Sequence, residues 1–228
     1  PATLFPYTTL FRSRLFHRTA AFGTDAQPAA RPGHDTFLDQ FSDSHLCLAL
    51  RNSLIVASVS TFFSTIIGTL VALGMERFRF RGKNALDSTL YLPIIIPDIS
   101  MAVMLLLFFV QAGMLLGRIG FNVSLGLTTI ILAHIAFNIS FVAIVVRSRL
   151  AHLDPSLEEA AMDLYASRWR TFRRVTLPLI MPGVLGGALL ALTLSLDDVV
   201  ITQLVQGPGA TTLPVFVFGL IKRQVTPE

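Results

Sequence analysis

The chain has 228 residues, of which 53% are apolar and only 14% are charged, and its mean hydropathy is +0.65. Soluble domains carry about 25% charged residues, so this composition excludes an ordinary cytosolic enzyme and a disordered tail. The net charge of +4 would suit a nucleic-acid binder, but the charges lie between long uncharged runs, as they do in integral membrane proteins. A single cysteine, Cys47, excludes a disulfide framework and a cysteine-based zinc site.

The N-terminal fifth of the chain differs from the rest. Residues 1–50 contain four arginines and, among their prolines, Pro28 and Pro32, but no run long enough to span a membrane. We expect 1–50 to be an N-terminal extramembrane segment and 51–228 to be the membrane domain. Residues 1–14 (PATLFPYTTLFRSR) resemble a cloning or assembly scar more than a targeting segment.

Four uncharged runs are long enough to cross a membrane. They cover residues 52–75, 99–117, 119–146 and 175–196. A spanning helix needs about 20 apolar residues, so the fold class that we predict is an all-α polytopic transmembrane bundle. The expected spans are 53–75, 89–112, 126–147 and 178–200. Another uncharged run, 199–221, is broken by Gly207, Pro208 and Gly209, and we interpret it as a turn followed by an interfacial segment.

The basic residues are distributed unequally between the two sides of this bundle. Two links carry ten of the 18 Lys and Arg residues: Arg77, Arg79, Arg81 and Lys83 after the first span, and Arg147, Arg149, Arg168, Arg170, Arg173 and Arg174 after the third. Only Arg118 lies between the second and third spans. Because cytoplasmic loops are enriched in Lys and Arg, we expect both basic links to be cytoplasmic.

The cytoplasmic link 148–177 predicts two short helices. Asp154 followed by Pro155 is typical of a helix N-terminus, and Ser167 is a suitable cap for a second helix. The first helix is acidic and amphipathic, and the second is basic. These features alone leave two hypotheses open: a pair of helices held on lipid headgroups, or a docking element for a partner protein.

The same link resembles the EAA loop of ABC importer permeases. The resemblance is carried by Glu159-Ala160-Ala161, position 165 after a gap of three, and Val175-x-Leu177-Pro178 after a gap of nine. It implies a coupling helix that docks into a cleft of an ATPase subunit. The turn formed by Glu159, Ala160 and Ala161 would dock, while Arg168, Arg170 and Arg173 would meet the ATPase surface or lipid phosphates.

One position departs from the family pattern. Tyr165 stands where the family normally has glycine. If the turn requires a positive φ, a bulky residue is strained there by about 1–2 kcal/mol.

Further segments resemble the second permease of spermidine/putrescine systems. They are RFRFRGKN (77–84), PDISMAV (97–103), SLDDVVIT (195–202), Gly207-Pro208-Gly209 with Leu213-Pro214, and VTPE (225–228). This branch usually has six spans, so the resemblance implies that the chain lacks the first and stops where the sixth would begin. It also implies a bacterial inner-membrane location and four kinds of partner: ATPase subunits, a second permease subunit in a heterodimer, an extracytoplasmic solute-binding protein, and membrane lipid. We expect no nucleic-acid partner.

Three acidic residues lie in or near the predicted spans, where an unpaired charge costs about 2.5–3.5 kcal/mol and so often marks a pathway. Asp98 follows Pro97, and two roles remain open: facing a cation path, or capping the helix that restarts after the proline. Asp197 and Asp198 lie about 29 Å beyond Pro178 along a straight helix, at the outer edge of the membrane. They would attract a polyamine or simply be solvated there, and Asp197 is the slightly preferred candidate.

Two polar residues share one face of the third span. His134 and Asn138 are four residues apart, so a path-lining role is conceivable, but hydrogen bonding between helices is the commoner use of such residues.

The sequence has no G-x-x-x-x-G-K-[ST] motif, so we expect ATP to be bound and hydrolysed by a partner, with no cofactor, metal or catalytic residue in this chain. The predicted function is the permease subunit of an ATP-driven importer for spermidine or putrescine. Two alternatives remain: a permease for another solute (an anion, a metal chelate or thiamine), and a secondary transporter or non-transporting membrane scaffold.

Overall fold

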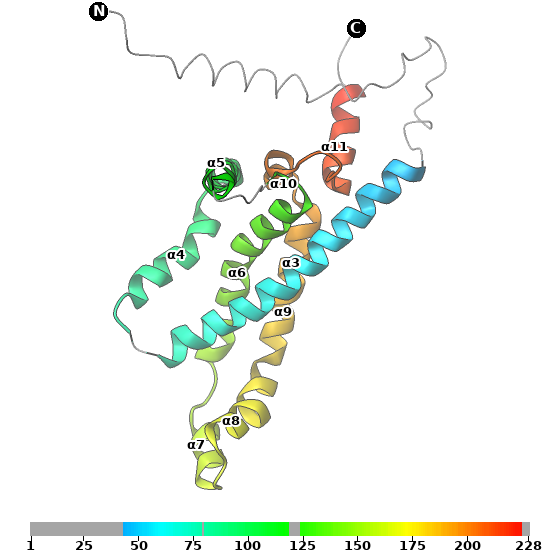
Figure 1. Ribbon diagram of the computed structural model, residues 1–228. Coiled ribbons are helices and arrows are strands. Elements are labelled where there is room, and N and C mark those ends of the chain that lie inside the picture. Colours follow the sequence, from blue (N-terminus) through cyan, green and yellow to red (C-terminus); the bar gives the residue numbers. More distant parts are fainter. Residues whose placement is uncertain (1–42, 79, 119–123, 225–228) are drawn as a thin grey trace, which may run out of the picture. The chain divides into compact units, whose positions relative to one another are not determined.

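The computed structural model describes residues 43–78, 80–118 and 124–224, and every regular element in these ranges is a helix (Figure 1). The predictions about residues 1–14 and about the VTPE segment lie outside the described residues. The described part is one compact unit that begins at Asp43. Its first helix starts there as well, so residues 43–50, which we assigned to the N-terminal segment, are already helical.

Four stretches of helix are long and apolar enough to cross a membrane, which confirms the predicted number of spans. They are α3 (Asp43–Arg77), α5 (Asp98–Gly117), α6 (Leu127–Ala151) and the continuous stretch of α8 (Arg168–Thr171), the π-helical turn η1 (Phe172–Thr176) and α9 (Leu177–Asp197). The all-α transmembrane fold class is therefore confirmed.

The second span does not have the expected bounds, 89–112. The chain forms α4 (Lys83–Ile95) and then α5, and only α5 is long enough to span. Ile96 between them has an extended backbone (φ −75°, ψ 132°). Pro97 explains the break, because proline lacks an N–H and disfavours a helical conformation in the residue before it.

The centre of the bundle is the packing of α3 against α6 and α9. Small and β-branched side chains form its core: Ala72 of α3, Val142 and Val146 of α6, and Ile180 and Ala191 of α9 are all fully buried. These small residues allow the helices to approach closely, as is usual where membrane helices cannot rely on hydrophobic exclusion from water.

A second core joins α5 to α6 through the short helix α10 (Val200–Val205). Phe109 of α5, Phe137 of α6, and Ile201 and Val205 of α10 are its main members. Helix α10 begins the run that we interpreted as a turn and an interfacial segment. A turn does follow it, and then α11 (Leu213–Gln224) packs against α3.

Gly207 is required in this turn. A Cβ at Gly207 would lie 1.8 Å from the carbonyl oxygen of Leu125, just before α6. Any other residue would therefore displace the backbone, so this glycine fixes how closely the turn approaches the start of α6.

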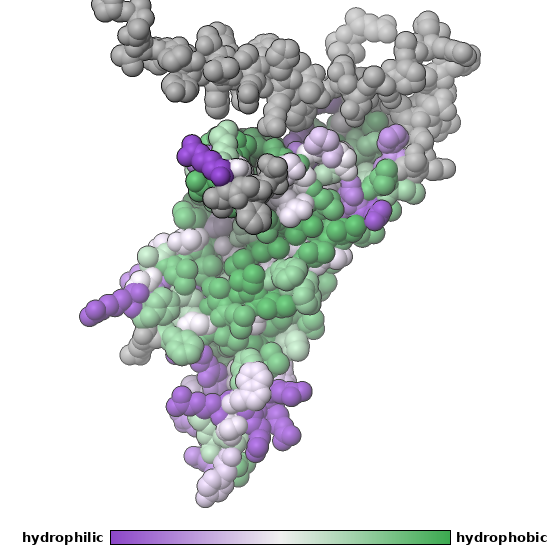
Figure 2. All heavy atoms as spheres, viewed as in Figure 1, coloured by the Kyte–Doolittle hydropathy of each residue, from purple (hydrophilic) through white to green (hydrophobic). Residues whose placement is uncertain are grey.

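The remaining helix, α7 (Ser156–Asp163), lies with α8 at the end of the bundle where α3 and α6 also end (Figure 1). Figure 2 shows apolar residues over the surface of the spanning helices and hydrophilic residues gathered around α7 and α8. An apolar surface of this kind suits contact with lipid, whereas the charged end suits water or a partner.

Candidate functional site

Helix α7 begins as the sequence predicts. The Asp154 carboxylate accepts a hydrogen bond from the backbone N–H of Ser156 at 2.9 Å, and this bond lowers the pKa of Asp154. Pro155 follows in a helical conformation, where its missing N–H costs nothing. The acidic first turn of α7, with Glu158 and Glu159, also suits the positive end of the helix dipole.

Helix α7 ends in a Schellman motif centred on Tyr165. The N–H of Tyr165 donates to the carbonyl of Met162 at 2.9 Å, and the N–H of Ala166 donates to the carbonyl of Ala161 at 3.2 Å. This motif places its C′ residue in the left-handed region, and Tyr165 has φ 61°. It is the only residue other than glycine with a positive φ in the described part of the chain. The turn thus keeps the conformation for which glycine is favoured, although this chain has a tyrosine.

Helix α8 follows with its predicted cap, since the Ser167 hydroxyl accepts a hydrogen bond from the N–H of Arg170 at 3.4 Å. Arg168 and Arg170 are exposed. Exposed apolar residues gather on the same end of the molecule, and we call them the apolar tip: Leu157, Met162, Leu164, Tyr165 and Trp169. Tyr165 is 95% exposed and Leu164 82% exposed. Apolar side chains on an otherwise charged surface are typical of a docking surface.

The other loop residues divide between the surface and the core. Glu159 and Ala160 are exposed and Ala161 is partly buried, all on α7. Leu177 packs against the α3–α6–α9 core, and Pro178 occupies the first turn of α9. The structure therefore places Glu159 and Ala160 where a partner can reach them, and it uses Leu177 to join the loop to the bundle.

The residue that holds α7 in place was not predicted from the sequence. Glu158 is 8% exposed, and both of its carboxylate oxygens accept hydrogen bonds from the guanidinium group of Arg77, at the end of α3. The hydroxyl of Thr176 in η1 donates to Oε1 of Glu158 at 2.5 Å. The bond from Arg77 lowers the pKa of Glu158 although burial opposes this shift. We call Arg77, Glu158 and Thr176 the α7 anchor.

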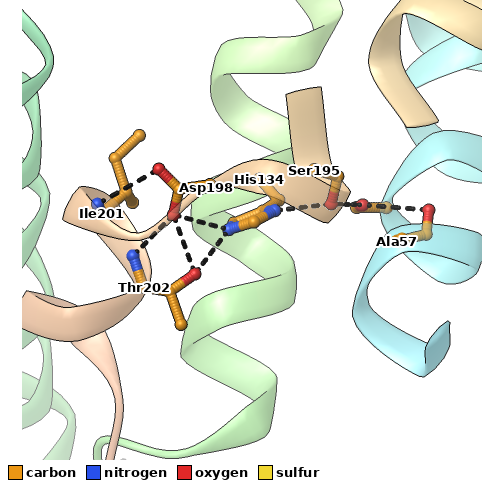
Figure 3. A network of polar contacts seen from close by, with 7 residues as sticks. Ala57, His134, Ser195, Asp198, Ile201 and Thr202 are labelled. Carbon is orange, nitrogen blue, oxygen red and sulfur yellow. Dashed lines mark hydrogen bonds and ion pairs between the residues drawn. The ribbon is translucent and has the colours of Figure 1, made fainter. Parts of the chain in front are cut away.

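A second group of polar residues is buried between the helices (Figure 3). Nδ1 of His134 lies 2.6 Å from the hydroxyl of Ser195 on α9, which lies 3.0 Å from the hydroxyl of Ser60 on α3. Nε2 of His134 lies 3.1 Å from the Thr202 hydroxyl and 3.4 Å from Oδ2 of Asp198. These five residues, which we call the polar chain, join α3, α6, α9 and α10.

The hydrogen bonds of the polar chain assign one proton on the histidine. The Thr202 hydroxyl donates to Oδ2 of Asp198 at 2.8 Å, so its oxygen can only accept from His134. Nε2 of His134 therefore carries a hydrogen. Asp198 also accepts from the backbone N–H groups of Ile201 (3.3 Å) and Thr202 (2.8 Å), so its carboxylate is well supplied with donors.

The order Ser195–His134–Asp198 resembles that of a hydrolase triad. Ser195 is only 5% exposed, and its hydroxyl is already shared between His134 and Ser60. No substrate carbonyl could approach such a hydroxyl, so the arrangement is suited to joining helices rather than to nucleophilic attack.

The structure separates the remaining predicted residues. Asp197 ends α9 and is exposed, whereas its neighbour Asp198 belongs to the polar chain. Asp98 is exposed in the first turn of α5, where a carboxylate favours the helix dipole, and Pro97 occupies the capping position. Asn138 is fully buried one turn from His134, and its amide group has no hydrogen-bond partner among the described residues.

Ser195 and Thr202 were not predicted. Thr202 offered a signal, since it lies four residues after Asp198 and bonds to it. Ser195 offered none, because its partner His134 lies 61 residues away. The role of Arg77 had no comparable signal, because it lies 81 residues from Glu158.

The fold and the loop define a multi-span membrane component of a transport system. The chain belongs to the family described as "Binding-protein-dependent transport system inner membrane component", whose family model matches residues 64–223. This family consists of transport components and not of enzymes.

Two relatives show where in the family the similarity lies. The chain is 45% identical over 187 residues to the putrescine transport system permease protein PotI of Escherichia coli K12, which covers 82% of this chain and 66% of PotI. It is 39% identical over 188 residues to the spermidine/putrescine transport system permease protein PotC of Haemophilus influenzae, covering 82% of this chain and 70% of PotC. The chain thus spans about two thirds of the length of these relatives.

Solved structures share the fold. A bacterial ABC transporter involved in the import of the acidic polysaccharide alginate matches with a TM-score of 0.68 and 21% identity, over 96% of this chain and 83% of that chain. The MetNI methionine ABC transporter in an inward-facing conformation matches with a TM-score of 0.55 and 22% identity, over 80% of this chain and 92% of that chain.

Proposed function

We propose that the chain is the membrane-spanning permease subunit of an ATP-driven importer of putrescine or spermidine in a bacterial inner membrane. The observation that carries this proposal is the surface of α7 and α8, where the residues of the apolar tip are exposed together with Glu159 and Ala160. The names of PotI and PotC, at 45% and 39% identity, support the choice of polyamines.

The exposed residues of α7 support the coupling role. An ATPase that closes on ATP can move the bundle only through a surface to which it binds. Buried apolar contacts supply most of the binding energy at such a surface. The apolar tip offers these contacts, and Arg168 and Arg170 beside it can pair with acidic groups of the ATPase. ATP itself would be bound by that partner.

The transported cation would meet carboxylates at the opposite end of the bundle. Helix α9 starts beside the loop and ends at Asp197, about 30 Å away along its axis. The exposed Asp197 can attract a polyamine to the mouth of the path, and the polar chain holds Asp198 beside it. Asp98, His134 and Asn138 are further candidates for the path.

Membership of the family supports two further partners. A second permease subunit would complete the path as a heterodimer, and an extracytoplasmic solute-binding protein would deliver the polyamine. The alginate transporter offers a parallel, since it has been solved in complex with an alginate pentasaccharide-bound periplasmic protein.

The test is capture of the ATPase subunit by the chain, followed by ATP-driven uptake of radiolabelled putrescine into proteoliposomes that contain the assembled transporter. Glu159→Lys reverses a charge on the docking surface, so we expect ATPase capture to fall at least about tenfold. The matched control is Arg81→Glu, an opposite reversal at an exposed residue outside the loop, which should leave capture unchanged.

The uptake assay separates the alternatives. With the proposed substrate, excess spermidine should inhibit putrescine uptake, and Asp197→Asn should raise the putrescine concentration needed for half-maximal uptake severalfold. Inhibition by thiamine, an anion or a metal chelate, but not by spermidine, would show that the substrate belongs to that other class and is not a polyamine. Capture that is indifferent to Glu159→Lys, or uptake without ATP, would contradict the coupling role and favour a secondary transporter or a scaffold.

A further inference from the structure

Helix α7 is attached to the bundle by a partly buried ion pair as well as by the chain itself, with Glu158 buried and Arg77 exposed on one side. Arg77 and Glu158 form a two-pronged pair in which each carboxylate oxygen meets a different guanidinium nitrogen. Such a pair fixes the orientation of both side chains, whereas a single hydrogen bond leaves rotation free. Arg77 is the last residue of α3, so the pair joins the end of a spanning helix directly to α7.

Thr176 adds a third residue to this attachment of α7. Its hydroxyl donates to the same Oε1 that meets Arg77, and its side chain is buried. Thr176 is the last residue of η1, and π-helical turns are often found at functional sites. Glu158 therefore links α7 at once to the end of α3 and to the start of the α9 span.

The end of α3 is also tied to two further helices. Glu76, next to Arg77, accepts a hydrogen bond from Nε of Arg147 on α6 at 3.0 Å. Nη1 of Arg147 donates to Asp87 of α4. A displacement of the end of α3 must therefore move these partners or break their charged hydrogen bonds.

We propose that Glu158 is a positioning residue through which a movement of α7 is transmitted to α3, α9 and, by way of Glu76 and Arg147, to α4. This inference rests on the proposed function, because it assigns the path by which the ATPase stroke reaches the spans. Glu158 and Glu159 are neighbours on α7 but have different roles. Glu158 faces the bundle, whereas Glu159 faces the ATPase. The packing of α7 on η1 and α8 holds the loop together, but it offers no comparable link to α3.

The test has one readout without the ATPase and one with it. Spin labels at Asp163→Cys on α7 and Leu70→Cys on α3, in a Cys47→Ser background, report the α3–α7 distance in the purified chain. ATP-driven putrescine uptake and ATP hydrolysis by the assembled transporter give the uptake per ATP hydrolysed. The variants are Glu158→Gln, Arg77→Gln and the charge swap Arg77→Glu with Glu158→Arg, and Arg81→Gln is the matched control for a lost surface arginine.

We expect a narrow distance distribution in the unsubstituted pair and in Arg81→Gln. Each single variant should broaden it and should lower uptake per ATP at least about fivefold while hydrolysis continues, because free energies of coupling between sites typically correspond to 5- to 150-fold effects. The charge swap should recover most of both readouts, since it restores an ion pair between the same two helices.

Several outcomes would overturn the inference. Glu158→Gln with wild-type uptake per ATP shows that transmission needs no ion pair. Single variants that lose uptake without recovery in the swap show that the two residues act separately. If the unsubstituted chain captures no ATPase, the proposed function is contradicted, and with it the transmission of an ATPase stroke. The distance measurement then shows separately whether Glu158 holds α7 against α3.

Discussion

Tyr165 illustrates how one side chain can conflict with the backbone that it occupies. The Schellman motif needs a left-handed residue after α7, and a side chain with a Cβ is strained there by about 1–2 kcal/mol. Tyr165 gains nothing from burial that would offset this strain, because its side chain is 95% exposed. Strain retained at an exposed position of the proposed docking surface supports a contact to a partner there.

Replacing Tyr165 with glycine should therefore stabilise the end of α7 in the isolated chain. We expect a gain of about 0.5–1 kcal/mol, because the relief of strain exceeds the greater entropy of glycine in the unfolded chain. Hydrogen exchange at the N–H of Ala166, which is bonded to Ala161, measures this directly as a severalfold slower exchange.

Tyr165→Ala is the control for this prediction, because it removes the aromatic ring and keeps the strain. Its exchange rate should match that of the unsubstituted chain. Equal exchange in the alanine and glycine variants would show that the backbone strain is negligible.

At the scale of the helices, the contact of α3 with α6 depends on Gly68. A Cβ at this position would lie 2.8 Å from Cβ of Val142 and 3.0 Å from the carbonyl oxygen of Ile139. Neither atom is the flexible end of a side chain, so the two helices would have to separate. Gly68→Ala should lower the free energy of unfolding by about 1–3 kcal/mol, as overpacking typically does. A lower melting temperature in detergent would show it.

The matched control lies on the same helix. A Cβ at Gly74 would meet nothing within 4 Å. Gly74→Ala should therefore raise stability by about 0.5–1 kcal/mol, since alanine is the better helix former. Equal effects of the two substitutions would mean that helix propensity, and not the α3–α6 contact, decides the outcome at Gly68.

At the scale of the whole molecule, the orientation in the membrane follows from the two basic links. Both lie at the end of the bundle that carries α7 and α8, and we expect that end to face the cytoplasm. In a Cys47→Ser background, a cysteine at Ser167 should react with a membrane-impermeant maleimide only after the cells are permeabilised. Ser167 is exposed, so a failure to react in intact cells reports its side of the membrane.

Ser124 provides the opposite control. It is exposed and lies just before α6, at the other end of the bundle from Ser167. Ser124→Cys should be labelled in intact cells. The reverse pattern, with Ser167→Cys labelled from outside, would place the loop beyond the reach of any cytoplasmic ATPase and refute the proposed function.

The features that the sequence predicted correctly depend on residues close together in the chain. Hydropathy over about 20 residues located the spans, and the caps at Asp154 and Ser167 each act over two or three residues. The expected break near Pro97 is equally local. Its consequence, a separate α4 in place of a longer span, was missed because hydropathy does not show whether a helix restarts in a new direction.

Only the tertiary structure distinguished between neighbouring residues of the same type. Glu158 is buried against Arg77 while Glu159 is exposed, and Asp198 binds His134 and Thr202 while Asp197 is exposed. The reason is physical: the partners of Glu158 and Asp198 include residues more than 60 positions away, and packing of the helices brings them together. Composition and periodicity therefore determined that this chain is a membrane bundle with a charged loop, whereas the contacts between helices decided which carboxylates face inward and which remain exposed.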